Sequence, residues 1–378
     1  MGDNYQKVFR GRDSLKKIPQ MAEKLGITRP MVIGSEKLVQ GLLKKAPFLL
    51  QAPVFTGYHA NPDLRDAEPA AELFQKQGCD GLVSIGGGSA MDTAKAVKAL
   101  LNAEKTEDVA ANRFPEKMRI PHLAIPGTAG SGAEATQTAV VYQDGRKLSL
   151  NHPALRPDGV ILDASLLDTL PDYHRKSCAL DALCQGIESY WSTASTEDSR
   201  VHAYLAILGV LDNLKAYLAG DAHAAEEMMD ASYQSGKAIQ LTRTTAAHAM
   251  SYQLTKTMGL AHGHACMLTL PVLWEHMETR EEGKEKLRDL SEKMRLGDLR
   301  MGPRLLRGIL FDLDMQIPSM PEESILDMLA DTVNTERLAN HPVPMSRSEV
   351  REVYRQAFLP LCEAEKQACL DLWNYYGA

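Results

Sequence analysis

The sequence predicts an α/β domain with a Rossmann-like, mostly parallel sheet, followed by an all-α helical domain. Short β-type runs alternate with amphipathic helical patterns over residues 1–165, an order typical of βαβ units. After Pro171 the chain is rich in Ala, Leu, Met, Glu and Lys at helical spacing. A length of 378 residues also exceeds one ordinary core and fits two domains. We therefore place the domains at residues 1–165 and 166–378.

The elements of the first domain follow from residue patterning. Four apolar runs, each bounded by Gly, Pro or Ser, predict the buried strands Met31–Ile33, Val54–Phe55, Leu82–Ile85 and Leu123–Ile125. Amphipathic stretches predict the helices Leu15–Leu25, Glu36–Leu43, Ala67–Gln77 and Ala90–Leu101. The Asp144-Gly145 pair inside Thr138–Leu150 predicts a β-hairpin, because this dipeptide suits a tight turn.

The composition excludes several classes of protein. Charged residues make up 24% and hydrophobic residues 44%, and 42 basic against 49 acidic residues give a net charge of −7, so we expect no nucleic-acid partner. No apolar run reaches the roughly 18 residues of a membrane span. The polar start lacks a signal peptide, and Gln6 stands where myristoylation needs Ser or Thr. Six scattered cysteines predict neither a disulfide framework nor a catalytic thiol. We expect a soluble, cytoplasmic protein.

A glycine-rich loop follows the third predicted strand and opens a helix. In Gly86-Gly87-Gly88-Ser89 the glycines let the backbone approach a ligand, and the following helix presents unpaired N–H groups to a phosphate or pyrophosphate. The loop is not GxGxxG, because Met91 stands at the third glycine, and it is not a Walker A loop. A plain strand-to-helix turn would also account for it.

A second small-residue loop, Pro126–Thr136, follows the next strand. It offers the hydroxyl groups of Thr128, Ser131 and Thr136. Two such loops at the carboxyl ends of neighbouring strands are where a dinucleotide lies in an open α/β sheet. Together they favour a nucleotide-binding site.

Polar residues in the second domain form a candidate metal site. Asp181 and Gln185 are four residues apart in an otherwise apolar run, so they share one helix face. His248, His262 and His264 follow in two later segments. A carboxylate with imidazoles from separate helices suits a divalent ion. Each of these residues could also be an ordinary buried, hydrogen-bonded group, so spacing alone leaves metal binding open.

Six segments, taken in order, resemble the iron-containing (group III) alcohol dehydrogenase family. They are GGGSAMDTAK (86–95), PGTAGSGAEAT (126–136), PDGVILDASLLDTLP (157–171), ALDALCQGIESYWS (179–192), TTAAHAMSYQLTKTMGLAHGHA (244–265) and ERLANHPVPMS (336–346). The resemblance covers nearly the whole chain. It implies a dinucleotide-binding domain, a helical metal-binding domain, NAD(P)H-linked interconversion of alcohols and aldehydes, and a homodimer.

The resemblance also implies roles for individual residues. A divalent ion, Fe²⁺ or Zn²⁺, is expected on Asp181, Gln185, His248 and His262, with Gln185 where the family usually has a third histidine. A neutral amide is a harder and weaker ligand than imidazole, so weaker binding or an ion other than iron is expected. Tyr252 replaces another usual histidine, which makes Tyr252 or His264 the candidate proton carrier. The expected coenzyme contacts are Thr56, Gly87, Gly88, Ser89, Asp92, Thr128, Ser131, Thr136 and Lys147.

The aspartate–glutamine helix, the run 242–248 and the His-Gly-His ending resemble the phosphonoacetaldehyde reductase branch of the family. That resemblance implies reduction of phosphonoacetaldehyde to 2-hydroxyethylphosphonate in phosphonate biosynthesis. A phosphonate dianion needs fixed donors, which Arg243, Thr244 and Thr245 would supply, although Arg243 could equally be a solvated helix residue. Thr56 stands where NAD-preferring relatives often have an aspartate that repels a 2′-phosphate, so NADPH should be accepted as well as NADH.

The expected mechanism is hydride transfer from the coenzyme to an aldehyde carbon whose oxygen is polarised by the metal. Three alternatives remain open at this point. They are a general short-chain alcohol or diol dehydrogenase of the same family, a metal-free non-catalytic relative, and a sugar-phosphate cyclase of related fold.

Overall fold

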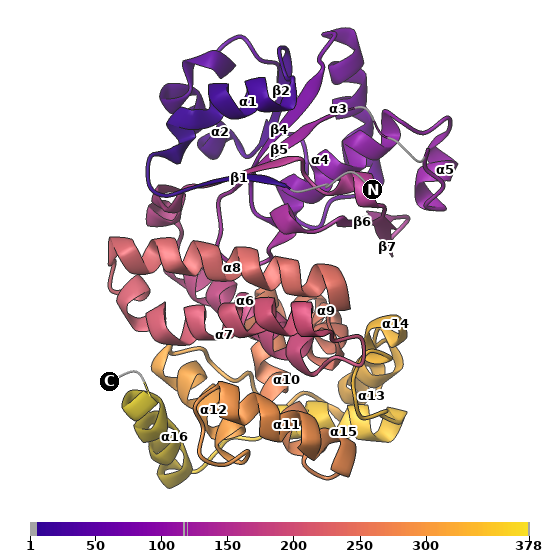
Figure 1. The fold of residues 1–378 in the computed structure, drawn as a ribbon. Helices are drawn as coiled ribbons and strands as arrows, with labels where there is room; N and C mark the ends of the chain where they lie inside the picture. Colours follow the sequence, from indigo (N-terminus) through magenta and orange to yellow (C-terminus); the bar gives the residue numbers. More distant parts are fainter. Residues whose placement is uncertain (1–5, 116–117, 119, 377–378) are drawn as a thin grey trace. The chain divides into compact units, whose positions relative to one another are not determined.

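The computed structural model describes residues 6–115, 118 and 120–376. The chain divides into two compact units, Met1–Leu170 and Pro171–Ala378 (Figure 1). The division predicted from the sequence, between residues 165 and 166, falls inside the 3₁₀ helix Ala164–Thr169. The Met1-Gly2 start, for which no myristoylation is expected, lies outside the described residues.

A six-stranded sheet lies at the centre of the first unit. Its order is β1-β8-β5-β4-β2-β3, and every neighbouring pair is parallel. The strands are β1 (Lys7–Arg10), β2 (Pro30–Gly34), β3 (Val54–Phe55), β4 (Gly81–Gly86), β5 (His122–Pro126) and β8 (Gly159–Leu162). This architecture confirms the predicted α/β fold class, and β2 to β5 are the four strands that the apolar runs predict.

Helices cover both faces of this sheet (Figure 1). Met31 and Ile33 of β2 pack on one face with α3 and α4, while Val32 between them packs on the other with α1 and α2. Burial on both faces is why these strands are nearly continuous apolar runs. The helices are α1 (Ile18–Leu25), α2 (Glu36–Lys45), α3 (Leu64–Lys76), α4 (Gly88–Leu100) and α5 (Thr106–Ala110).

Three helix starts differ from the prediction, and the fourth helix begins at Gly88 and not at Ala90. The first helix begins at Ile18 and not at Leu15, because Pro19 occupies its first turn, where proline is well tolerated; residues 14–17 form a 3₁₀ turn. The third begins at Leu64 and not at Ala67, because Asp63 and Asp66 form a capping box. The predicted hairpin is present as β6 (Thr138–Gln143) and β7 (Arg146–Asn151), with positive φ at both Asp144 and Gly145.

The second unit is helical throughout its described residues, 171–376, as predicted. Its helices are α6 (Asp172–Trp191), α7 (Glu197–Leu218), α8 (Ala222–Thr242), α9 (Ala246–Met258), α10 (His262–Met277), α11 (Glu281–Lys293), α12 (Met301–Asp312), α13 (Glu323–Asp331), α14 (Thr335–Leu338), α15 (Arg347–Ala357) and α16 (Glu363–Tyr376). The buried helix α6 packs against α7, α8 and α10, and α10 packs in turn against α9. Among the described helices, none has the length and apolar character needed to cross a membrane.

Candidate functional site

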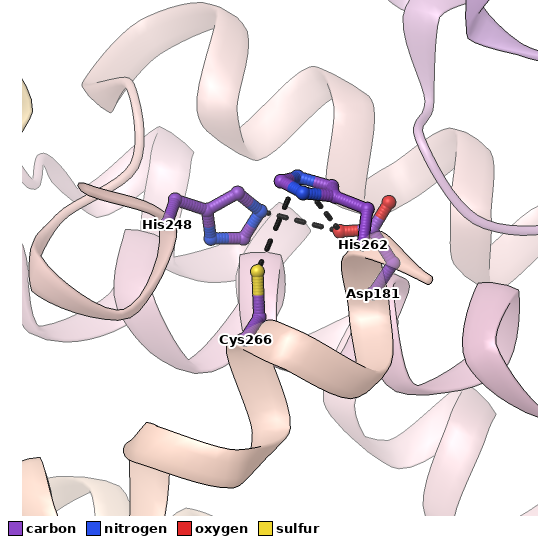
Figure 2. Close-up of side chains that lie close together, drawn as sticks. All are labelled: Asp181, His248, His262 and Cys266. Atoms are coloured by element: carbon purple, nitrogen blue, oxygen red, sulfur yellow. Dashed lines mark hydrogen bonds and ion pairs between the residues drawn. The ribbon is translucent and has the colours of Figure 1, made fainter. Parts of the chain in front are cut away.

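Four side chains from three helices converge in the second unit (Figure 2). Asp181 of α6, His248 of α9, and His262 and Cys266 of α10 each contribute one ligand-type atom, and all four atoms lie within 4.8 Å of one another. The Asp181 Oδ1 atom is 3.2 Å from His248 Nε2 and 4.0 Å from His262 Nε2. Cys266 Sγ is also 4.0 Å from His262 Nε2. The His262 side chain is 39% exposed, whereas those of Asp181 and His248 are buried.

The approach of α10 to α6 depends on Gly263. A Cβ atom at this position would lie 1.9 Å from the Ser177 carbonyl oxygen and 2.6 Å from the Asp181 backbone nitrogen. The missing side chain therefore lets the first turn of α10 contact α6. His262 starts α10 and Cys266 lies one turn later on the same face, so both side chains point at Asp181.

A buried carboxylate orients His248. His248 Nδ1 hydrogen-bonds to Glu188 Oε2. The other carboxylate oxygen, Oε1, accepts hydrogen bonds from Thr245 N (3.1 Å), Thr245 Oγ1 (2.7 Å) and Ala247 N (2.8 Å). With Nδ1 committed to Glu188, Nε2 is the ring nitrogen left to face Asp181. A histidine that binds a metal commonly hydrogen-bonds through its other ring nitrogen to a carboxylate in this way.

A hydroxyl group orients His262 in the same way. Ser251 Oγ donates to the His248 carbonyl at 2.9 Å, which leaves it to accept a hydrogen bond from His262 Nδ1 at 3.3 Å. The ring of Tyr252 stacks on the His262 ring with centroids 5.8 Å apart and an interplanar angle of 12°. Both histidines thus present Nε2 to Asp181 and Cys266, and two imidazoles, a carboxylate and a thiol are a donor set that fits a divalent zinc or iron ion.

The four groups also shift one another's ionisation. Although burial opposes its ionisation, the charge of His262 and the hydrogen bond from His248 lower the pKa of Asp181. Burial likewise opposes ionisation of Cys266, but the neighbouring His248 and His262 lower the pKa of its thiol to about 7. The same contacts raise the pKa of His262 to about 9, so a divalent ion that binds here must displace protons from the cluster.

Gln185 lies beside this cluster, one helical turn after Asp181. Its Nε2 atom donates to Asp181 Oδ1 at 3.3 Å, and its Oε1 atom accepts from Ser235 Oγ at 2.8 Å. The amide nitrogen of Gln185, and not its carbonyl oxygen, therefore faces the Asp181 carboxylate.

His264 is turned away from the converging atoms. Its Nδ1 atom hydrogen-bonds to Tyr173 Oη at 3.0 Å, and its backbone N–H donates to Ser177 Oγ. Since His264 is two residues after His262, it lies on the opposite side of α10. Of the two candidate proton carriers, only Tyr252 contacts a residue of the cluster.

The three predicted phosphonate donors have separate surroundings. Arg243 forms an ion pair with Glu336, and both side chains are at least half exposed. Thr244 Oγ1 accepts a hydrogen bond from Arg337 Nη1 at 3.0 Å. Thr245 is fully buried and bonded to Glu188, so its hydroxyl supports His248.

The two small-residue loops of the first unit meet as predicted. Gly127 N donates to the Gly86 carbonyl at 2.8 Å, because β4 and β5 are adjacent parallel strands. Gly86 has φ of +150°, and a Cβ atom there would lie 2.8 Å from Ala90 Cβ. Thr128 and Ser131 lie against Gly87 and Gly88, whose added Cβ atoms would be 3.5 and 3.4 Å from the two side-chain oxygens. The two loops thus lie side by side at the start of α4.

The remaining predicted coenzyme contacts lie elsewhere in this unit. Asp92 Oδ2 accepts from Val140 N at 3.1 Å, and Thr136 Oγ1 accepts from the buried Lys95 Nζ at 3.0 Å, so both tie α4 to the segment around β6. Lys147 lies on β7. Thr56 is exposed immediately after β3.

Two residues of the metal-site region are absent from the sequence prediction. Cys266 is four residues after His262, the same spacing that singles out Asp181 and Gln185. Glu188 is seven residues after Asp181 and therefore on the same helix face. Helical spacing was thus a signal for both.

Comparisons with known proteins agree over most of the chain. Residues 6–164 match the model for "Iron-containing alcohol dehydrogenase", and residues 177–358 match "Fe-containing alcohol dehydrogenase family, C-terminal". A phosphonoacetaldehyde reductase of Streptomyces viridochromogenes is 37% identical over 270 residues, covering 62% of this chain and 68% of the relative. Lactaldehyde reductase of Escherichia coli is 28% identical over 298 residues, 75% of this chain and 77% of the relative. The crystal structure of sulfoacetaldehyde reductase from Bifidobacterium kashiwanohense with NAD⁺ superposes with a TM-score of 0.85 at 26% identity, covering 93% of this chain and 97% of that one.

Proposed function

This chain belongs to the iron-containing alcohol dehydrogenase family, and on that premise we propose that it reduces phosphonoacetaldehyde to 2-hydroxyethylphosphonate. Membership makes it a NAD(P)-linked oxidoreductase acting between alcohols and aldehydes, which sets aside the non-catalytic relative and the sugar-phosphate cyclase. The substrate is the part that we propose.

The observation that carries the proposal is the pair of histidine Nε2 atoms turned towards Asp181. A divalent ion held there supplies Lewis-acid polarisation of a carbonyl oxygen, and NAD(P)H supplies the hydride. Asp181, His248 and His262 hold the ion. Gln185, expected from the sequence as a fourth ligand, is proposed as the hydrogen-bonding partner that positions the Asp181 carboxylate.

Other residues of this chain bind and orient the reactants. Gly87, Gly88 and Ser89 receive the coenzyme pyrophosphate at the start of α4, where the first-turn N–H groups are free of helical partners. Thr128 and Ser131 flank that cradle. Tyr252, stacked on His262, is the proposed route by which a proton reaches the product oxygen.

A negatively charged substrate is supported by the relatives and by two arginines. Phosphonoacetaldehyde and sulfoacetaldehyde, named for two similar proteins, are both two-carbon aldehydes with an anionic group. Arg243 lies in the segment leading into α9, which carries His248, and Arg337 of α14 donates a hydrogen bond to Thr244 in the same segment. Arg243 has φ of +59°, an uncommon conformation for a residue with a side chain. Its ion pair with Glu336 is exposed and therefore weak, and we propose that a phosphonate replaces the glutamate.

The coenzyme proposal is that both NADH and NADPH are accepted. The exposed Thr56 after β3 carries no charge that would repel a 2′-phosphate. The cytoplasmic location and the homodimer expected from the sequence remain predictions.

Steady-state reduction of phosphonoacetaldehyde and acetaldehyde, with each coenzyme and with a chelated control, tests the proposal. We expect chelator-sensitive turnover with a clear preference for phosphonoacetaldehyde. Arg243→Ala and Arg337→Ala should each lower kcat/KM for phosphonoacetaldehyde roughly 10- to 100-fold, the value of a hydrogen bond to a charged group, and leave acetaldehyde turnover unchanged. Equal turnover of acetaldehyde by the unaltered enzyme would favour a general short-chain alcohol dehydrogenase.

A further inference from the structure

We infer that Cys266 is a ligand of the catalytic metal and that its thiolate makes the site select Zn²⁺ over Fe²⁺. This inference rests on the proposed metal site and extends it by one residue. It assigns the sulfur atom, and not the Gln185 amide, as the fourth protein ligand.

The position of the thiol supports this assignment. Cys266 Sγ lies within 4.8 Å of the ligand atoms of Asp181, His248 and His262, and 4.0 Å from His262 Nε2 (Figure 2). A tetrahedral zinc ion with ordinary bond lengths holds its ligand atoms about 3.3–3.6 Å apart. The four atoms thus surround a space close to the size of a zinc site, and a small contraction would bring all four within bonding distance of one ion.

The surroundings of Cys266 leave its sulfur directed at that space. His248 Nδ1 is bonded to Glu188 and His262 Nδ1 to Ser251, so the Nε2 atom of each ring faces the cluster that includes the thiol. Cys266 itself is fully buried. The buried sulfur therefore lies among two imidazole Nε2 atoms and a carboxylate, all of which are metal-ligand groups.

Gln185 is the competing fourth ligand, and its hydrogen bonds oppose that role. Its Oε1 atom, the atom able to bind a metal, accepts from Ser235 Oγ at 2.8 Å. Its Nε2 atom, which faces Asp181 Oδ1 at 3.3 Å, has no lone pair to donate. Binding through the amide oxygen would require the amide to rotate, which would break its hydrogen bond to Asp181 Oδ1.

The thiolate determines which ion fits. Soft sulfur ligands with imidazole favour Zn²⁺, whereas hard oxygen ligands do not discriminate in its favour. On binding, the Cys266 thiol releases one proton to solvent and forms an S–metal bond, with no change of oxidation state. The partly exposed His262 ring marks the side on which a further coordination position stays accessible.

Cobalt substitution of the full-length enzyme tests the assignment directly. Co²⁺ bound through a thiolate gives an intense near-ultraviolet charge-transfer band, while visible ligand-field bands report bound Co²⁺ with any ligands. We expect both sets of bands in the unaltered enzyme. Cys266→Ala and Cys266→Ser should lose the charge-transfer band and bind Co²⁺ roughly a hundredfold more weakly, since loss of an outer partner alone costs about 10- to 100-fold.

Two neighbouring variants serve as matched controls. Cys184→Ala removes another fully buried thiol, on α6, and Gln185→Ala removes the competing ligand; both should retain the charge-transfer band. Persistence of the band in both Cys266 variants, or its loss in Cys184→Ala, would overturn the assignment. Visible bands without any charge-transfer band in the unaltered enzyme would refute the thiolate but preserve the metal site. Absence of bound Co²⁺ altogether would refute the metal site and the thiolate together.

Metal competition tests the selectivity. The unaltered enzyme, dialysed against equal free Zn²⁺ and Fe²⁺ without oxygen, should retain zinc. The Cys266→Ser variant should shift towards iron. An unchanged metal ratio in Cys266→Ser would contradict the role of the thiolate in selection.

Discussion

Glu188 is the buried carboxylate that connects the start of α9 to the metal-binding face of α6. Its side chain accepts from the backbone N–H groups of Thr245 and Ala247 and from the His248 ring. The start of a helix favours an anion, because its N–H groups and dipole point at it. Although burial opposes ionisation, the charge of His248 and the hydrogen bonds from its ring and from the Thr245 hydroxyl lower the pKa of Glu188. One residue thus caps a helix and fixes a histidine ring.

Glu188→Gln should therefore weaken metal binding about 10- to 100-fold, the usual effect of removing a partner behind a metal ligand. The amide keeps the size of the side chain but has only one acceptor oxygen for the ring and the backbone. Competition with a chelating dye measures the affinity. Glu285→Gln, at an exposed position of α11, is the control, and equal affinities in the two variants would contradict this role.

Glu134 is a buried carboxyl group in the second small-residue loop. Only 1% of the residue is exposed, and burial raises its pKa from 4.5 to about 7, opposed in part by the charge of Lys95. The folded state therefore keeps its proton at a pH where the unfolded chain has lost it. Stability from this group is present below about pH 4.5 and is lost as the pH rises through about 7.

Replacing Glu134 by Gln removes this pH dependence. At about pH 8 the variant should be more stable than the unaltered protein by on the order of 3 kcal/mol, since each pKa unit corresponds to about 1.4 kcal/mol. Below about pH 4.5 the two proteins should unfold at the same urea concentration. Urea unfolding at both pH values provides the measurement, and parallel pH profiles would show that Glu134 ionises freely in the folded state.

At the scale of elements, the contact between α6 and α10 assembles the cluster. Gly263 lets the two helices meet where Asp181, His262 and Cys266 converge, because any side chain there would overlap the backbone of α6. The hydrogen bond from the backbone N–H of His264 to Ser177 Oγ lies at the same crossing. A change in this crossing separates ligands that belong to different helices.

Gly263→Ala should abolish tight metal binding and lower the melting temperature. The added methyl group would lie 1.9 Å from the Ser177 carbonyl oxygen, so α10 must move away from α6. Calorimetry with and without Zn²⁺ measures both effects. Gly297→Ala is a matched control in the same unit, because no atom lies within 4 Å of its added Cβ atom; it should leave both quantities nearly unchanged.

Two strands of the sheet depend on pairing with neighbouring strands. The sequence prediction omitted β1, whose four residues include Lys7 and Arg10, and β8, a four-residue run before Asp163. The charged ends of β1 leave no apolar run, whereas Val160–Leu162 in β8 is an apolar run that the prediction missed. Pairing of β1 with β8, and of β8 with β5, makes them strands.

At the scale of the whole molecule, the coenzyme loops and the metal cluster belong to different compact units. NADP⁺ should therefore slow hydrogen exchange at residues 86–91 and 126–133, whereas Zn²⁺ should slow it in α6, α9 and α10. Mass spectrometry of peptides from the full-length protein resolves the two patterns. Mg²⁺, which prefers oxygen ligands, should not reproduce the zinc pattern. Coenzyme protection confined to Pro171–Ala378 would contradict the assignment of the loops.

By itself the sequence determined the alternation of strands and helices, the two adjacent small-residue loops and the family. These depend on local periodicity and short motifs, such as the four-residue spacing of Asp181 and Gln185. Short local motifs also carry the signals for the helix caps and for the hairpin turn.

Only the tertiary structure decided which side chains share the metal-site region. In the folded chain Cys266 and Glu188 lie in this region, His264 hydrogen-bonds to Tyr173, and the Thr245 hydroxyl donates to Glu188. The reason is physical: a spacing along one helix fixes which residues share a face. Which faces meet depends on how α6, α9 and α10 pack, and that packing depends on contacts such as the one Gly263 permits.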